Sequence, residues 1–221
     1  MAVLAVEYCA YGAAEGDFPR GSTAAAALEA AFLFATSPRN IDGTEGDSCN
    51  GLGYSPQQVV LYGQSIGSAS VCRVAAKYSC TAQKWFCSSF LKQGTGDRQQ
   101  LLGGVVLHSP IASGLRTITP DGCCSPVCCC SYFEPFSNTT LARRVSCPFF
   151  IIHGTEDNEV PLFHGKMLAE TRERAGIAEK DKAYWVEGAG HSNIIDVADA
   201  EYYRQLYDFL LLLWARREIS A

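Results

Sequence analysis

The chain has 221 residues, enough for one α/β domain with a substantial core or at most two small domains, and we expect one. Its formal net charge of −5 gives no reason to expect a nucleic-acid partner. The longest apolar run, Phe209–Trp214, is far shorter than the ~20 residues needed to cross a bilayer, so we expect no transmembrane helix.

The N-terminal residues indicate a cytoplasmic protein. Met1–Tyr8 has no basic segment and carries Glu7 within its apolar stretch, which is typical of a strand and not of a signal peptide. In that compartment the 11 cysteines are expected to be reduced thiols, and their odd number agrees. The glycosylation sequon at Asn138–Thr140 is then expected to be silent.

The first third of the chain predicts a strand, a helix and a long loop. Val3–Tyr8 is an apolar run suited to a strand buried on both faces. Ser22 can cap a helix that continues through Phe34 and ends near Pro38. The glycine-containing loop Arg39–Pro56 then leads into a strand over residues 58–62.

Strands and helices alternate through the remainder of the chain. The expected elements are a helix to about Tyr78, an insertion over Cys80–Gln100, strands at Gly104–His108, Pro148–Gly154 and Lys182–Glu187, a helix over Leu162–Ala175 and a closing helix over Asp199–Arg216. The closing helix places Tyr203, Leu206, Leu210 and Leu213 on one apolar face. Residues 111–144 show no clear periodicity, and we interpret them as an excursion, or lid, over one end of the sheet. This order predicts a three-layer α/β fold with a mostly parallel sheet.

Residues Gly63–Gly67 form a Gly-x-Ser-x-Gly motif between an apolar strand and a helix-compatible segment. That context is typical of a nucleophile elbow, in which the central serine, Ser65, stands exposed on a tight turn. Gly63 and Gly67 keep side chains out of the bend, while Gln64 and Ile66 flank the serine. Ser65 also lies at a helix N-terminus, where free N–H groups can stabilise an oxyanion.

Polar residues follow two further strands. Asp157 comes after the strand that ends at Gly154, and His191 comes after the last strand. Since sites on parallel α/β sheets lie at the carboxyl ends of the strands, we expect Ser65, Asp157 and His191 to converge as nucleophile, acid and base. Glu156 is the alternative acid.

The other histidines, His108, His153 and His164, lack comparable positions relative to the serine, and His153, still within its strand, has a structural or supporting role. No His, Cys and Asp set has the spacing of a closed metal site, so neither a metal nor another cofactor is expected.

Five segments resemble the domain-containing-17 subgroup of α/β-hydrolases, which includes depalmitoylating thioesterases: Leu61–Gly67, Val106–Pro110, Ser113–Arg116, Ile151–Asp157 and Trp185–His191. The resemblance runs from about Ala2 to Phe209. It implies the same three roles for Ser65, Asp157 and His191, with the Ile66 N–H as one oxyanion donor.

Several features depart from that family. Its members have strands and a His-Gly loop upstream of the position of Val3, which supply a second oxyanion N–H and a strand beside the elbow strand. We therefore expect an N-terminally truncated hydrolase in which Val3–Tyr8 either leaves a gap beside Val59–Tyr62 or slides to close it. The N-terminal lipidation cysteines of the family are absent, Cys9–Ala14 departs from its Gly-Tyr-Gly-x-Ser turn, and Asn193 stands where the resemblance leads us to expect an acidic residue.

Three functions remain open. The first is a serine hydrolase acting on acyl esters or thioesters, with S-acylated proteins or small acyl esters as substrates. The second is a catalytically impaired binding protein whose oxyanion hole is incomplete. The third is a carboxylesterase or serine peptidase.

A cysteine-rich stretch lies within the excursion, at Cys123, Cys124, Cys128, Cys129 and Cys130. Adjacent thiols cannot all turn toward one zinc ion, which leaves a solvated loop or a site of reversible S-acylation. Acylation beside Tyr132, Phe133 and Phe136 would hold the protein at a membrane surface.

Overall fold

The computed structural model describes residues 1–16, 20–39, 51–79, 102–118 and 137–220, with side chains to residue 215. The elements in chain order are α1 (Gly21–Thr36), η1 (Pro56–Gln58), β1 (Val60–Gln64), α2 (Gly67–Tyr78), β2 (Gly104–His108), α3 (Gly114–Ile118), α5 (Asn138–Ala142), β3 (Phe149–Gly154), α6 (Phe163–Arg174), β4 (Lys182–Val186), α7 (Ile194–Ala198) and α8 (Ala200–Ser220). All strands predicted from the elbow onward are present.

The four strands pair in parallel in the order β1-β2-β3-β4. Gln64, the last residue of β1, is level with His108, and His108 is level with Ile152 of β3. The residues that follow β1, β2 and β3 therefore emerge at the same edge of the sheet, as the three-layer α/β prediction requires.

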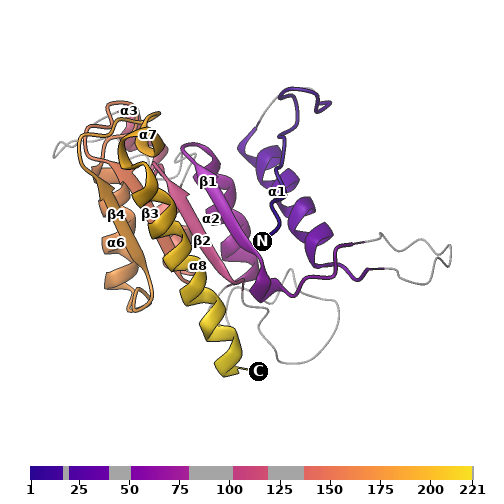
Figure 1. Ribbon diagram of the computed structural model, residues 1–221. Coiled ribbons are helices and arrows are strands. Elements are labelled where there is room, and N and C mark those ends of the chain that lie inside the picture. The colour runs from indigo at the N-terminus through magenta and orange to yellow at the C-terminus, as the bar shows by residue number, and fades with distance from the viewer. Residues whose placement is uncertain (17–19, 40–50, 80–101, 119–136, 221) are drawn as a thin grey trace.

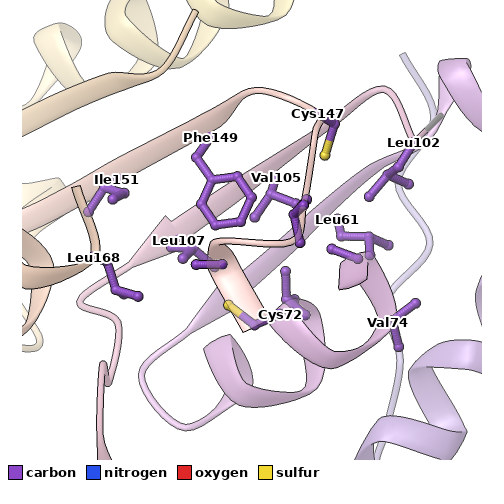
Figure 2. Packing of buried hydrophobic residues seen from close by; sticks show 14 of the residues in the cluster. Leu61, Cys72, Val74, Leu102, Val105, Leu107, Cys147, Phe149, Ile151 and Leu168 are labelled. Carbon is purple, nitrogen blue, oxygen red and sulfur yellow. The ribbon is translucent and has the colours of Figure 1, made fainter. Parts of the chain in front are cut away.

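Helices cover both faces of this sheet (Figure 1). One apolar cluster joins α1, α2, α5 and α6 to the face formed by Leu61, Leu107 and Ile151 (Figure 2). The second joins α7 and α8 to the opposite face through Val106, Phe150 and Ile152. Because both faces are covered, β2 and β3 are buried along their whole length and read as unbroken apolar runs.

Arg172 is a fully buried charged side chain that joins α6 to the segment before β3. Its guanidinium donates to the carbonyl oxygens of Ala142, Val145 and Cys147 and pairs with Asp181. The planar fork also lies over the Phe149 ring, 3.8 Å from its centroid. A charge can be buried here because every direction of the guanidinium meets an acceptor or an aromatic face.

The prediction of a buried strand at Val3–Tyr8 is wrong. This segment has no strand conformation, no described residue pairs with it, and Val3 is 82% exposed. An apolar run becomes a buried strand only where neighbouring strands accept its backbone groups. Neither predicted outcome for Val3–Tyr8 therefore holds, because both assume a strand there; within the described chain, β1 pairs with β2 only.

Two smaller predictions about the helices need correction. Ser22 does not cap α1; the Arg20 N–H donates to Thr23 Oγ1 at 2.9 Å and the Thr23 hydroxyl donates to the Arg20 carbonyl. On α8 the predicted Leu206, Leu210 and Leu213 do face the sheet, but Tyr203 is 59% exposed and its neighbour Tyr202 is buried. Tyr202 lies seven residues before Phe209 and eleven before Leu213, which are both buried, so the phase of the helix turns Tyr202 inward and not Tyr203.

Some predictions fall on residues outside the described ranges. They are the whole insertion at Cys80–Gln100, the centre of the excursion at residues 111–144, and the cysteine cluster. These predictions remain untested.

Candidate active site

The turn after β1 has the strained geometry expected of a nucleophile elbow. Ser65 has a φ of 50°, a conformation that a non-glycine residue adopts only where the surroundings enforce it. Its N–H donates to the His108 carbonyl at 2.8 Å, which fixes the turn to the end of β2. Gly63 is required by close packing, since a Cβ there would lie 2.7 Å from Val71 Cγ2 and 2.8 Å from the Gly67 carbonyl oxygen.

The Ser68 hydroxyl supports the same turn from the first turn of α2. It donates to the Ser65 carbonyl at 2.6 Å and accepts the Ile111 N–H at 3.1 Å. Asn138 of α5 holds the same segment by donating to the Ile111 carbonyl at 2.6 Å. Asn138 is fully buried, so the sequon amide is used inside the fold and is inaccessible for glycosylation.

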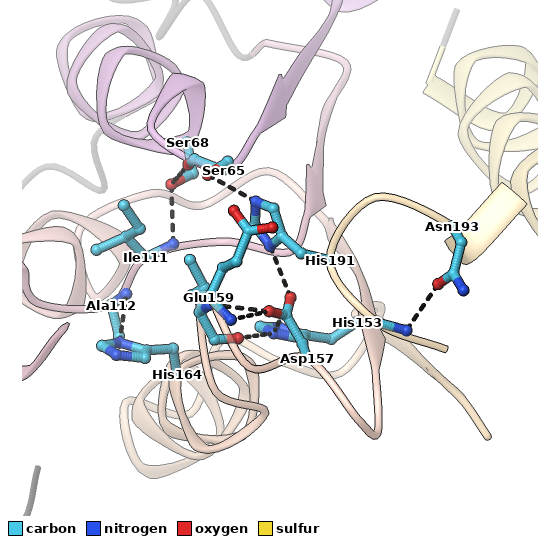
Figure 3. A network of polar contacts seen from close by, with 12 residues as sticks. Ser65, Ser68, Ile111, Ala112, His153, Asp157, Glu159, His164, His191 and Asn193 are labelled. Carbon is cyan, nitrogen blue, oxygen red and sulfur yellow. Dashed lines mark hydrogen bonds and ion pairs between the residues drawn. The ribbon is translucent and has the colours of Figure 1, made fainter. Parts of the chain in front are cut away.

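Ser65, His191 and Asp157 form a continuous hydrogen-bonded chain (Figure 3). His191 Nδ1 lies 2.7 Å from Asp157 Oδ2, and His191 Nε2 lies 3.0 Å from Ser65 Oγ. An ionised carboxylate only accepts, so Nδ1 carries the imidazole proton and Nε2 presents its lone pair to the serine hydroxyl. This is the tautomer in which an imidazole can act as a base toward serine.

Asp157 is buried, whereas Glu156 is exposed. The second carboxylate oxygen, Asp157 Oδ1, accepts the N–H groups of Glu159 at 3.0 Å and Val160 at 2.8 Å. These bonds leave Oδ2 directed at His191. The geometry therefore favours Asp157 over Glu156 as the partner of the histidine.

The loop that carries His191 packs tightly on the end of β3. A Cβ at Gly154 would lie 2.2 Å from the Ala189 carbonyl oxygen, so only glycine allows this approach. Asn193, which differs from the acidic residue expected there, accepts the Gly190 N–H through Oδ1 at 2.7 Å. A side-chain oxygen is what this turn uses, and an amide supplies it as well as a carboxylate does.

The backbone of Ile66 is available for a substrate oxygen. Among the residues that the structure describes, the Ile66 N–H makes no hydrogen bond, and Ile66 is the N-cap residue of α2. The positive end of the helix dipole adds to its attraction for negative charge.

Sequence analysis did not foresee the polar cluster of Tyr62, His108 and Tyr202 behind the elbow. The Tyr62 hydroxyl lies 2.7 Å from His108 Nδ1 and 2.9 Å from the Tyr202 hydroxyl. Burial lowers the pKa of His108 to about 4, with smaller contributions from His191 and His153. Tyr62 and Tyr202 are far apart in the chain, so no local pattern could have revealed the cluster.

His164 accepts the Ala112 N–H through Nδ1 at 3.2 Å and supports the segment that follows β2. Within the described ranges no group of three His, Cys, Asp or Glu side chains could hold a metal ion. None of the helices in those ranges is long and apolar enough to cross a membrane.

Comparison with known proteins agrees with this fold. The chain is 34% identical to mouse alpha/beta hydrolase domain-containing protein 17C over 158 residues, covering 72% of this chain and 39% of the relative. It is 31% identical to the Xenopus tropicalis 17C protein over 208 residues, covering 94% and 52%, and 31% identical to human 17B over 192 residues, covering 87% and 51%. The chain thus spans about half the length of these relatives or less.

A family model and solved structures give coarser matches. Residues 130–214 match the prolyl oligopeptidase family. The fold superposes on a Pyrococcus furiosus esterase with a TM-score of 0.57 at 16% identity, covering 92% of this chain and 68% of that one. It also superposes on a butyrate-bound thermophilic esterase from Thermogutta terrifontis with a TM-score of 0.56 at 19% identity, covering 88% and 66%. The chain therefore has the α/β-hydrolase fold and is similar to the domain-containing-17 proteins over most of its length.

Proposed function

We propose that the protein is a serine hydrolase that cleaves acyl esters or thioesters through a covalent acyl-enzyme. The observation that carries the proposal is the unbroken hydrogen-bonded chain from Ser65 through His191 to Asp157. Ser65 Oγ attacks the acyl carbonyl while His191 Nε2 takes its proton, and Asp157 stabilises the resulting imidazolium. His191 then gives the proton to the leaving oxygen or sulfur, and water repeats the sequence to release the acid.

The Ile66 N–H is the proposed oxyanion donor of the described chain. It lies one residue after the nucleophile at the start of α2, where the carbonyl oxygen would gain charge as Ser65 adds to the carbon. One donor is typically worth about a hundredfold or more in rate, so the completeness of this hole decides whether turnover is fast or residual.

The preferred substrate class is the S-acyl group of an acylated protein. The resemblance to domain-containing-17 proteins supports this class, and the butyrate bound to the Thermogutta terrifontis esterase supports small acyl esters as test substrates. A thioester suits the site because a thiolate leaves more readily than an alkoxide and asks less of the general acid.

The direct test is labelling with a fluorophosphonate probe, which reacts with an activated serine. We expect stoichiometric labelling of the intact protein at Ser65 and none after Ser65→Ala. Ser68→Ala is unsuitable as a control, because the Ser68 hydroxyl supports the turn that holds Ser65. Absence of labelling in folded protein would refute the hydrolase. Labelling without turnover of any substrate would identify a binding protein with an incomplete oxyanion hole.

Peptide-bond hydrolysis is the second candidate, and the match of residues 130–214 to the prolyl oligopeptidase family favours it. Thioester, ester and peptide substrates compared at equal concentration distinguish the two. We expect kcat/KM to be highest for the thioester, whereas peptide turnover above both acyl substrates would assign a peptidase.

The cysteines at 123, 124 and 128–130 are proposed to be S-acylated and to hold the protein at a membrane surface. Replacing all five by serine should abolish labelling by a palmitate analogue and move the protein out of the membrane fraction. Cys9→Ser is the matched control and should change neither. Unchanged partitioning of the five-serine variant would leave a solvated loop.

A further inference from the structure

A buried histidine, His153, contacts the acid of the site. It lies in β3 with no exposed surface, and its Nε2 is 2.7 Å from the Val160 carbonyl oxygen and 3.3 Å from Asp157 Oδ2 (Figure 3). A carbonyl oxygen can only accept, so Nε2 must carry a proton. The shorter distance makes Val160 the principal acceptor and the carboxylate a secondary one.

The other ring nitrogen of His153, Nδ1, has no hydrogen-bond partner among the residues that the structure describes. Nδ1 is buried without a hydrogen bond, and Gly165 of α6 packs against it so closely that a Cβ there would lie 2.7 Å away. Burial is also the main reason that the pKa of His153 is lowered. The ring is therefore neutral, with its single proton on Nε2.

Val160 connects this histidine to the orientation of the carboxylate. Its N–H donates to Asp157 Oδ1 at 2.8 Å, while its carbonyl accepts from His153 at 2.7 Å. The backbone N–H and the backbone carbonyl of Val160 therefore both hold the turn over residues 157–160 in place. Because Oδ1 is fixed by backbone donors, Oδ2 is left in line with His191 Nδ1.

We propose that His153 is a positioning residue for Asp157: its Nε2–H clamps the turn after β3 and keeps Oδ2 aimed at His191. This inference rests on the proposed function, in which the pair of Asp157 and His191 activates Ser65. His153 itself does not touch the nucleophile.

The groups that face the pair determine how the clamp can be read from a pH profile. They are His153 on β3 and His108 on β2, whose charges act on Asp157 and His191, and Glu159 in the turn itself (Figure 3). His108 and His153 are neutral near pH 7 because burial lowers the pKa of each. Neither His108 nor His153 is therefore expected to contribute a titration near neutrality.

The test compares two variants of the intact chain, His153→Leu and His153→Gln. Leucine removes the donor, whereas the glutamine amide nitrogen can occupy the position of Nε2. We expect the leucine variant to lose at least tenfold in fluorophosphonate labelling rate and in kcat, with little change in KM. Its acid limb should move to lower pH, because a carboxylate no longer aimed at His191 stabilises the imidazolium less. Glutamine should restore most of both.

An unchanged acid limb together with an unchanged rate in His153→Leu would overturn the clamp. An acid limb displaced to higher pH would also overturn it, because it would show that His153 only competes with His191 for Asp157 Oδ2. Nitrogen-15 NMR of the wild-type protein is a second measurement, which locates the proton on the His153 ring and can be made even if the variants do not fold. A proton on Nε2 of His153 agrees with the clamp, and one on Nδ1 refutes it. If wild-type Ser65 is not labelled at all, the proposed function fails, while the NMR result still decides the clamp.

Discussion

Replacing Asp157 by asparagine should disable the site by imposing the wrong tautomer on His191. The two backbone donors, Glu159 N–H and Val160 N–H, require an oxygen at the Oδ1 position. Turning the amide so that its NH₂ faced them would leave both donors unsatisfied, at about 1–3 kcal/mol for the buried Val160 N–H and less for the part-buried Glu159 N–H. The NH₂ must then take the Oδ2 position, 2.7 Å from His191 Nδ1 in the native site.

In that arrangement the amide donates to Nδ1, so the imidazole proton moves to Nε2. An Nε2–H cannot accept the proton of Ser65, and we expect kcat to fall by about 10⁴-fold, as for the same substitution in serine protease triads. The assay is hydrolysis of a chromogenic butyrate ester, with the tautomer read by nitrogen-15 NMR. Glu156→Gln is the matched control and should keep activity within about twofold, because Glu156 is exposed and outside the chain of hydrogen bonds. Asp157→Asn with more than a tenth of wild-type kcat would refute the assignment of the acid.

Three further predictions concern Gly63 of the elbow, the buried His108 and the buried Arg172. Gly63→Ala should destabilise the fold by at least about 1–3 kcal/mol in urea denaturation and abolish probe labelling, since the added methyl meets backbone and side chain below 3 Å; a variant that melts and labels like wild type contradicts this. Stability should fall as the pH drops from about 6.5 to about 4, by up to about 3 kcal/mol, because the unfolded chain protonates His108 near 6.5 and the folded chain only near 4; His108→Asn should flatten that dependence in denaturation at a series of pH values. Arg172→Leu should cost about 3–5 kcal/mol, because it removes the counter-ion of Asp181 and the donors to three buried carbonyl oxygens, whereas Arg174→Leu on the exposed side of the same helix should change stability by less than about 0.5 kcal/mol; equal effects of the two would show that the buried arginine contributes nothing.

Local patterns in the sequence were sufficient for the strands and the longer helices from the elbow onward, but not for the short helices α3, α5 and α7. Unbroken apolar runs predicted β2 and β3 because strands covered on both faces carry no polar alternation. The Gly-x-Ser-x-Gly motif predicted the turn that holds Ser65, since glycines at fixed positions are a local steric requirement. The order of polar residues after strands predicted that Ser65, Asp157 and His191 would meet, because parallel strands end at one edge.

The chain by itself therefore determined the period of each element, the tight turns and the residues that leave the strand ends. Tertiary structure alone decided that Val3–Tyr8 is not a strand, that Tyr202 and not Tyr203 packs inward, and that Asp157 and not Glu156 meets His191. It also decided the polar partners of His108 and His153. The physical reason is that a strand needs a neighbour and a buried polar group needs a specific partner, and both are supplied by residues whose separation in the chain carries no periodic signal.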